Sequence, residues 1–395
     1  MKRLLILGGP VFQKRVVEKA HEMGLYVGLM DINDDAPAAE LADEFFVGSI
    51  LDKAAALEVA HEFKPDAIMS GACDTSVRTV AWLCAKLGLP GNSEECAYRA
   101  TDKVAMLEAF AHSGVSHPAF EVVPKNSLEG YDTSLEYPVI VKPTDSAGGR
   151  GINLVESEDK LIPALLSSSR AGRSGDVLVE ECMHGPEVSV EVLVVDGAPY
   201  VLQITDKITS GAPHFYEVGH VQPSSLPSAS KEAIASLASR AVLSVGVDNG
   251  PAHVEIMLTA DGPKMVELGA RLGGDCITSY LIDGSITGID MTKAAIKLAL
   301  GEKLQSLSYS NSGRFFAVKF IPSSKGTIKS IDGIDEARKT AGVIHVESTG
   351  VAGKDYKAAV DDSSRFAFVV ASGDNRDDAL SCCDGAIEKI SIDVR

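Results

Sequence analysis

Residues 250–275, GPAHVEIMLTADGPKMVELGARLGGD, decide the fold because they predict a β-hairpin whose side chains carry chemistry. Two runs of alternating apolar residues flank Ala260-Asp261-Gly262. We expect these three residues to form the loop, with its glycine at a positive φ. The resulting register pairs Met257 with Met265.

The same register places Glu255 directly opposite Glu267 on one face of the hairpin. Cβ atoms of such cross-strand pairs lie about 4.5–5.5 Å apart, so two carboxylates repel each other unless a cation lies between them. Hard carboxylate oxygens suit Mg²⁺, which keeps several waters and shares its remaining sites with nucleotide phosphates. The alternative is two solvated glutamates on an exposed strand, and the hairpin alone does not choose between the two.

A lysine and the glycine-rich loop that follows it form a candidate phosphate site. Lys142 ends the apolar run VIVKP, where an ammonium group is costly to bury unless it meets an anion. The next residues, Thr144–Gly151 (TDSAGGRG), contain glycines that let backbone N–H groups approach phosphate oxygens. The loop lacks the GxxxxGK[ST] spacing, which sets a P-loop NTPase aside. Each signal alone is weak, because the lysine can extend to solvent and such a turn can simply connect strands.

The first 95 residues predict a parallel sheet with helices on both faces. Short apolar runs alternate there with helical patterns, at Arg3–Leu7, Tyr26–Met30, Phe45–Val47 and Ala67–Ser70. Gly8-Gly9, between the first strand and the first helix, could hold an anion on helix N-terminal amides. The full GxGxxG spacing is missing, so a nicotinamide-binding domain is a weak interpretation.

The rest of the chain predicts further α/β and α+β units. Two strands are expected around a break in residues 176–197, and another strand in YVLQITDK, followed after Arg314 by several short strands. Joints between units are expected near residues 98, 196 and 310. Helical patterns occupy Lys103–Ser113, Lys231–Val245, Asp290–Leu300 and Arg376–Ile390.

Composition narrows the class of protein. At 395 residues the chain is longer than a single hydrophobic core usually supports, so roughly two to four packed units are expected. The formal charge of −18 disfavours nucleic acids and anionic membranes as partners. No apolar run reaches the length of about 18 residues that spans a bilayer, and the opening MKRLLILGGP is too short in its apolar part for a signal peptide. Seven cysteines without CxxC spacing fit free thiols, so a cytoplasmic protein is expected.

The order of these motifs resembles the ATP-grasp superfamily over essentially the whole chain. The resemblance rests on Lys103, then VKP with DSAGGRG, LVEECMHGPEVSVEV, HVEIML and VELGARLGGD. The phrases GPAHVEI, YEVGHVQPS and ELGARLGGD are most similar to carboxylate-amine ligases of the L-amino-acid ligase type, which form dipeptides. SKGTIKSIDGIDEA is similar to the C-terminal part of biotin-carboxylase-like members.

This resemblance implies an α/β and α+β protein with the ATP-grasp fold. Residues 1–97 would form a Rossmann-like, pre-ATP-grasp domain, and residues 98–310 the ATP-grasp domain. Within it, residues of about 125–200 would form a mobile lid. Residues 311–395 would form a biotin-carboxylase-like α+β extension.

The resemblance also implies ATP and Mg²⁺, with Mn²⁺ as an alternative ion, and a role for individual residues. Lys103 and Lys142 would hold ATP phosphates, and the metal ions would lie on Glu255 and Glu267. Arg271 would grip the transferring phosphoryl group or the substrate carboxylate, as bidentate geometry favours. Backbone groups of Glu180, Glu181 and Cys182 would read the adenine edge, Glu187 would hold the ribose, and Ser146, Ala147, Gly148, Gly149 and Gly151 would close over the β and γ phosphates.

The sequence departs from the superfamily pattern at one position. Many members have asparagine two residues after the second metal-binding glutamate, whereas this chain has Gly269. Related ligases carry small residues there, so the glycine is interpreted as a mark of the subgroup. It leaves a second Mg²⁺ with only two carboxylates to hold it.

The implied reaction activates a carboxylate, with an amino acid as the expected class, as an acyl phosphate that an amine attacks with release of ADP. Lys142 and Arg271 would neutralise charge on the transferring group. Glu217 and His220, in HFYEVGH, are candidates for gripping the amino acid or taking the amine proton, with a surface-loop histidine as the alternative. His253 is either a satisfied strand histidine or part of the cleft. Asp74 and Thr75 follow a strand of the N-terminal sheet, where such sheets present ligands.

Two other functions stay open on the sequence. One is a purine-pathway, carbamoyl-phosphate-type or biotin-carboxylase-like ATP-grasp enzyme that uses formate or bicarbonate. The other is an ATP-binding protein without catalysis. The expected partners are small-molecule carboxylates and amines, with no nucleic acid and no membrane, and the resemblance implies a homodimer.

Overall fold

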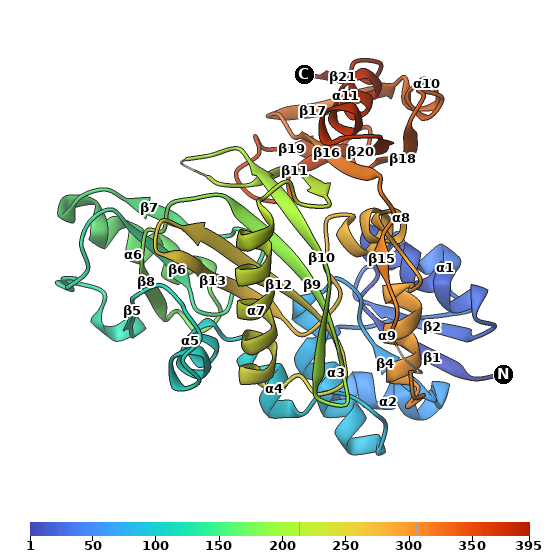
Figure 1. Ribbon diagram of the computed structural model, residues 1–395, viewed down its shortest axis with the longest axis horizontal. Coiled ribbons are helices and arrows are strands. Elements are labelled where there is room, and N and C mark those ends of the chain that lie inside the picture. The colour runs from blue at the N-terminus through green and yellow to red at the C-terminus, as the bar shows by residue number, and fades with distance from the viewer. Residues whose placement is uncertain (213, 305–306) are drawn as a thin grey trace.

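The computed structural model describes residues 1–212, 214–304 and 307–395, and its main sheets have four, four and eight strands (Figure 1). The N-terminal sheet is parallel, in the order β3-β2-β1-β4. Its strands are β1 (Arg3–Leu7), β2 (Tyr26–Asp31), β3 (Glu44–Val47) and β4 (Ala67–Met69).

Alternation along β1 explains why helices cover both faces of this sheet. Leu4 and Ile6 pack in one cluster with α1 (Lys14–Glu22) and α9 (Met291–Ala299). Leu5 and Leu7 point to the opposite face and pack with α2 (Lys53–Phe63) and α3 (Asp74–Leu87). The expectation of a parallel sheet buried on both faces is confirmed.

The backbone amides of Gly8 and Gly9, after β1, are bound by groups of the protein itself. The Gly9 N–H donates to Asp31 Oδ2 at 2.7 Å, and the Gly8 N–H donates to the Met30 carbonyl at 2.8 Å. Both amides are therefore engaged within the protein. This turn is not an open anion site.

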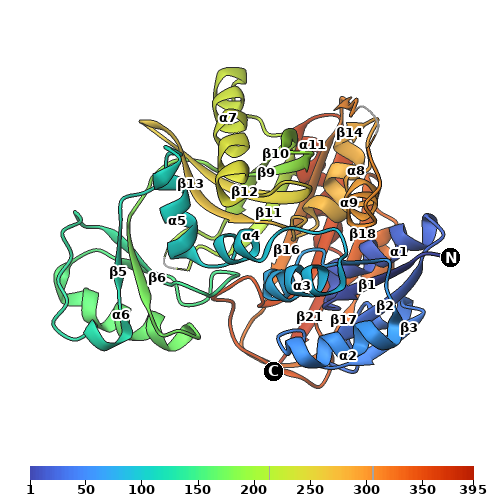
Figure 2. The same ribbon diagram turned by 90° about the horizontal axis from the view of Figure 1, so that it is seen from below.

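A second four-stranded sheet is antiparallel, in the order β5-β8-β6-β7, and lies at the left of Figure 1. Apolar residues of its strands pack against α6 (Leu161–Ala171). Figure 2 shows α3, α4 (Glu94–Arg99) and α5 (Lys103–His112) in a row between the N-terminal sheet and this one. The strands are β5 (Phe120–Val123), β6 (Val139–Pro143), β7 (Asn153–Val155) and β8 (Val177–Glu181).

The eight-stranded antiparallel sheet has the order β13-β12-β9-β10-β11-β16-β20-β18. Apolar residues of α7 (Ser228–Val245), spaced by one helical turn, pack on β9 and β12, and α11 (Arg376–Ile387) packs on β16 and β20. The strands are β9 (Glu187–Val195), β10 (Ala198–Thr209), β11 (Glu217–Gln222), β12 (Gly250–Thr259), β13 (Gly262–Gly269), β16 (Phe315–Pro322), β18 (Val343–Ser348) and β20 (Arg365–Gly373).

This sheet runs across two of the expected joints. β9 and β10 pair on either side of residues 196–197, so no sheet boundary lies near residue 196. β16 pairs with β11, so strands after residue 310 extend the sheet that precedes it. The sheet expected for the lid ends with β8 at Glu181. The domain limits at residues 97 and 310 stay predictions.

The register of the β12–β13 hairpin is correct at its chemical end and wrong near its loop. Glu255 lies opposite Glu267, as predicted. Thr259 pairs with Gly262, however, so the loop has two residues, and Met257 faces Lys264 instead of Met265. A bulge beside Glu255 supplies the extra residue on β13 that restores the predicted pairing. Gly262 has the expected positive φ, at 111°.

The remaining elements surround the large sheet. The last helix ends at Ile387, three residues before the expected Ile390. It is followed by β21, which the sequence did not predict and which pairs with β17. None of the helices described is both long and apolar enough to cross a bilayer. The elements around the large sheet are a π-helical turn at Ile277–Leu281, α8 (Ile282–Ser285), β14 (Ile286–Thr287), β15 (Ser310–Asn311), β17 (Gly326–Asp332), α10 (Ile334–Arg338), β19 (Asp355–Tyr356) and β21 (Ser391–Val394).

Candidate active site

Each of the two facing glutamates of the hairpin has an ammonium group of its own. Lys103 Nζ, at the start of α5, lies 2.5 Å from Glu267 Oε1. Lys207 Nζ, on β10, lies 3.2 Å from Glu255 Oε2. The side chains of Glu255 and Glu267 are 22% and 35% exposed, so solvent or a ligand can reach both carboxylates. The repulsion predicted for the pair is therefore offset by lysines within the chain.

Lys207 is a site residue that the sequence interpretation missed. Its buried ammonium also lies 2.6 Å from Glu187 Oε1 and 2.8 Å from Glu217 Oε1. Burial works to lower the pKa of Lys207, but the charges of the three glutamates raise it well above its usual value. Burial raises the pKa of Glu187 despite this lysine.

A signal for Lys207 was present in the sequence. Gln203, Thr205 and Lys207 alternate along β10, and the first two are buried polar residues. Polar side chains at every second position of an otherwise apolar strand mark a face that turns toward other polar groups. Glu187, expected to hold a ribose, lies on this face of the neighbouring strand and contacts Lys207.

His253 is a buried strand histidine that also contacts the predicted metal-binding pair. Its Nδ1 lies 2.5 Å from Glu191 Oε1, and its Nε2 lies 3.4 Å from Glu255 Oε1. Burial works to lower the pKa of His253, but the charge of Glu191 raises it to about 10. The imidazolium therefore helps to lower the pKa of Glu255, together with Lys207 and against the effect of burial. Glu191 was not foreseen from the sequence.

Lys142 meets an anion, as predicted, and that anion belongs to the protein. Its Nζ lies 2.7 Å from Glu180 Oε2, and both side chains are buried. The other oxygen of Glu180 has no hydrogen-bond partner in the described part of the chain. At the end of β8, Glu181 accepts from Lys264 Nζ at 2.7 Å, its N–H donates to the Ala119 carbonyl, and Cys182 is a free thiol. The backbone contacts expected with adenine stay predictions.

A cavity of about 280 Å³ brings several predicted residues together. Lys103 and Glu267 line it from one side, and Ser146 and Ala147 of the glycine-rich loop line it from another. Asp74 and Thr75, from the start of α3, line its N-terminal wall. More basic than acidic side chains surround the cavity, since Lys53, Lys103, Arg78, Arg150 and Arg173 face Asp74, Asp145 and Glu267.

The glycines of the loop have different surroundings. Gly148, Gly149 and Gly151 all have positive φ, at 66°, 71° and 80°. A Cβ on Gly148 would meet nothing within 4 Å, whereas one on Gly151 would lie 2.6 Å from Ala171 Cβ. Gly151 is therefore required by packing within the protein. Gly149 faces the C-terminal region, where a Cβ would lie 3.6 Å from Asp362 Oδ2.

Arg271 is engaged with the N-terminal sheet. Its Nε and one terminal nitrogen donate to the two oxygens of Asp74, each at 2.6 Å, and its other terminal nitrogen donates to the Leu272 carbonyl at 2.9 Å. Burial opposes its charged form, but Asp74 raises the pKa of Arg271 further above its usual value. Two of its five N–H groups stay available for a ligand.

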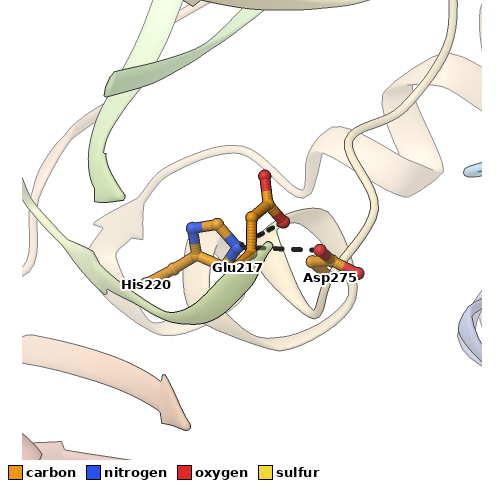
Figure 3. A group of neighbouring side chains, drawn as sticks. All are labelled: Glu217, His220 and Asp275. Atoms are coloured by element: carbon orange, nitrogen blue, oxygen red, sulfur yellow. Dashed lines mark hydrogen bonds and ion pairs between the residues drawn. The ribbon is translucent and has the colours of Figure 1, made fainter. Parts of the chain in front are cut away.

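Glu217 and His220 form a buried cluster with Asp275, in which both carboxylates face the imidazole (Figure 3). His220 Nε2 lies 3.2 Å from Glu217 Oε2 and 3.8 Å from Asp275 Oδ2. His220 is fully buried, so the alternative of a surface-loop histidine is wrong. Burial works to lower its pKa, but the charge of Glu217 and the hydrogen bond with Asp275 raise the pKa of His220 to about 8. Asp275 was not foreseen.

Two groups of carboxylates differ in how well they suit a metal ion. Glu255 and Glu267 fit Mg²⁺, because they offer hard oxygens from facing positions and Glu267 opens to the cavity that Lys103 and the loop line. The cluster of Glu217, His220 and Asp275 fits an ion poorly. Within the described residues Arg365 binds both oxygens of Asp275 through its two terminal nitrogens, which leaves neither oxygen free for an ion.

Known proteins resemble this chain in both its central and its C-terminal parts. A family model described as the ATP-grasp domain matches residues 135–279, and a second, described as L-amino acid ligase C-terminal domain 2, matches residues 319–395. Carnosine synthase 1 of Homo sapiens is 26% identical over 76% of this chain and 40% of its own length. Alanine–anticapsin ligase of Bacillus subtilis is 28% identical over 55% of this chain and 51% of its own. This chain spans about half or less of these relatives.

A solved structure agrees with the fold over the full length. The L-amino acid ligase from Bacillus licheniformis superposes with a TM-score of 0.85 at 24% identity, over 100% of this chain and 99% of that one. This likeness confirms the predicted fold class, with an α/β unit before the ATP-grasp core and an α+β extension after it. The chain therefore contains an ATP-grasp domain at residues 135–279 and an L-amino acid ligase C-terminal domain 2 at residues 319–395.

Proposed function

We propose that this protein is an ADP-forming ligase that activates a carboxylate, with an amino acid as the expected class, for attack by an amine. The observation that carries the proposal is the meeting of Lys103, Glu267 and the glycine-rich loop around one cavity. A lysine, a hard carboxylate and free backbone amides are the groups that a metal-bound triphosphate needs. The relatives whose names state a ligase activity support the chemical class.

The first step would join the substrate carboxylate to the γ-phosphorus of ATP and break its bond to the β-phosphate oxygen, releasing ADP. Lys103 and Lys142 would hold the phosphates, and the two N–H groups left on Arg271 would face the transferring group. Glu255 and Glu267 would hold Mg²⁺, which supplies positive charge for the phosphate oxygens when bound. For this, Lys207 would shift its contact from Glu255 toward Glu187 and Glu217, which it already touches.

The second step would join the amine nitrogen to the acyl carbon, with phosphate leaving as the C–O bond breaks. The amine must lose a proton, and the cluster offers two carboxylates with exposed surface, Glu217 at 13% and Asp275 at 18%. Arg365 binds both oxygens of Asp275, which leaves Glu217 as the better base. We assign Glu217 to the amine and His220, which is fully buried behind it, to holding the Glu217 carboxylate in place. The acyl phosphate has to be kept from water, and the loop and the β5–β8 sheet are the proposed lid.

The proposal is tested by ADP release from Mg-ATP with separate pools of L-amino acids, formate and bicarbonate, with products identified by mass. ADP release that depends on an amino acid, with an amide product, is the expected result. Turnover with formate or bicarbonate alone would instead indicate a purine-pathway or biotin-carboxylase-like enzyme. Binding of ATP without turnover on any carboxylate would point to a noncatalytic protein.

We propose a homodimer, from the resemblance to ATP-grasp ligases, and light scattering of the purified chain tests it. We also propose a cytoplasmic location, from the free thiols, which cell fractionation tests.

A further inference from the structure

Arg365 reaches from the C-terminal part of the chain into the cluster of Glu217, His220 and Asp275. It is the first residue of β20, and its side chain is 8% exposed. Its two terminal nitrogens lie 2.7 Å and 3.0 Å from the two oxygens of Asp275. The guanidinium lies over the ring of Phe320, 3.7 Å from its centre, which fixes the plane of the fork.

The same arginine and its neighbour hold the backbone of Glu217. Arg365 donates to the Glu217 carbonyl at 3.3 Å and lies 3.7 Å from its carboxylate. Asp362 Oδ1 accepts from the Glu217 N–H at 2.7 Å and from Arg365 at 3.1 Å. Both main-chain groups of Glu217 are thus held by a segment about 145 residues later in the chain.

The backbone at Asp275 needs such support. Asp275 and Cys276 have φ of 51° and 67°, a conformation that side-chain-bearing residues rarely adopt, and a π-helical turn follows directly. Strained backbone of this kind persists where surrounding contacts hold it, and it gathers at functional sites. The paired hydrogen bonds from Arg365 are the strongest contact that Asp275 makes.

We propose that Arg365 is a positioning residue for the amine step. Through Asp275 and Glu217 it fixes both carboxylates around His220, so that Glu217 keeps the orientation needed to take the amine proton. The C-terminal extension would then complete the active site. Asp362, which Gly149 of the glycine-rich loop faces, places the same segment beside the proposed lid. This inference rests on the proposed ligase function.

The test separates the two steps of the reaction. Hydroxylamine is already unprotonated near neutral pH, so it traps an acyl phosphate as a hydroxamate without a base. Arg365→Gln is expected to lower kcat for amide formation roughly 100-fold, as misplacement of a reacting group by about 1 Å does. Hydroxamate formation and the KM for ATP should stay within about threefold of the wild type. Arg365→Lys, which keeps the charge and loses the fork, should recover part of the amide rate.

The matched control is Arg314→Gln, an exposed arginine of the same region that donates to Ser372 Oγ, and it should leave both rates unchanged. If Arg365→Gln folds poorly, Asp362→Ala removes the acceptor of the Glu217 N–H while leaving the Arg365–Asp275 pair, and should show the same split at smaller size. Equal loss of amide and hydroxamate formation in these variants overturns the proposal, and so does full amide activity. A wild type without carboxylate-dependent ADP release instead overturns the ligase function itself.

Discussion

Both glutamates of the hairpin, Glu255 and Glu267, contact basic side chains. These contacts decide how the loss of either carboxylate changes the stability of the protein. Glu267 carries the buried Lys103, and Glu255 carries Lys207 and His253. Removing a glutamate from a bare pair would relieve repulsion. Here it leaves a buried cation without its nearest anion, which is unfavourable.

Glu267→Ala should therefore lower both activity and stability. ADP formation should fall roughly 100-fold or more, since a group that stabilises transition-state charge is lost. The free energy of unfolding should fall by about 1–2 kcal/mol, less than for a fully buried pair because Glu267 is 35% exposed. Glu302→Ala, which removes a surface partner of Lys2, is the control and should change stability by less than about 0.5 kcal/mol. Unchanged ADP formation in Glu267→Ala would refute the metal assignment.

His220 makes the stability of the protein depend on pH. Its pKa of about 8 in the folded chain exceeds the unfolded value of about 6.5, so the protonated form favours folding. This contribution is fully present below about pH 6.5, is lost as pH rises through 8, and amounts to roughly 2 kcal/mol. Urea unfolding at pH 6 and pH 9 should show the gap between wild type and His220→Gln shrinking by that amount. An equal gap at both pH values would contradict the assignment.

At the level of elements, the connection between β8 and β9 is fixed against the end of β12. Leu258 N–H donates to the Pro186 carbonyl at 2.9 Å, and Gly185 has φ of 148°. A Cβ on Gly185 would overlap the carbonyl of Leu258. This contact ties the β5–β8 sheet to the hairpin that carries the glutamates.

Gly185→Ala should therefore lower the free energy of unfolding by more than the unfavourable φ alone would. Gly130→Ala is the control, because Gly130 has φ of 74° and a Cβ there meets nothing within 4 Å. The control should cost about 1 kcal/mol from positive φ alone. Gly185→Ala should cost roughly 2 kcal/mol more and weaken ATP binding, as chemical unfolding and calorimetry would measure. An equal loss of stability in the two variants would show that the connection between β8 and β9 can move to accommodate the added methyl group.

At the scale of the whole molecule, a partly buried ion pair joins units that are distant in sequence. Asp74, at the start of α3, binds Arg271 after β13, and the two residues are 197 positions apart. Asp74 lines the cavity, and its pKa is lowered by the charge of Arg271 although burial opposes this. The pair therefore fixes the N-terminal wall of the cavity relative to the hairpin.

A double-mutant cycle with Asp74→Asn and Arg271→Gln tests this link. Each single variant should lower the free energy of unfolding by about 1–2 kcal/mol, since each leaves a partly buried charged group without its partner. The double variant should cost less than the sum, with a coupling energy of about 1–3 kcal/mol. Additive costs would mean that the two side chains do not stabilise each other in solution.

While the ATP-grasp fold was implied by a resemblance, the sequence by itself determined most of the elements, their α/β and α+β character and the pairing of Glu255 with Glu267. These follow from periodicity and from the positive φ of Gly262, which are local properties of the chain. Local properties did not predict the bulge in β13. The loop is one residue shorter than predicted and the bulge adds one residue to β13, so the two differences cancel and Glu255 still faces Glu267.

The tertiary structure alone decided which side chains meet. Arg365 lies in no motif of the sequence. Lys207 and Asp275 end the runs YVLQITDK and VELGARLGGD, but neither run shows that strands from distant segments bring these residues beside Glu217. Burial then makes unpaired charge unfavourable, so the site assembles as a network of alternating signs. The sequence fixes what each residue can do, and sheet order fixes where each charge finds its partner.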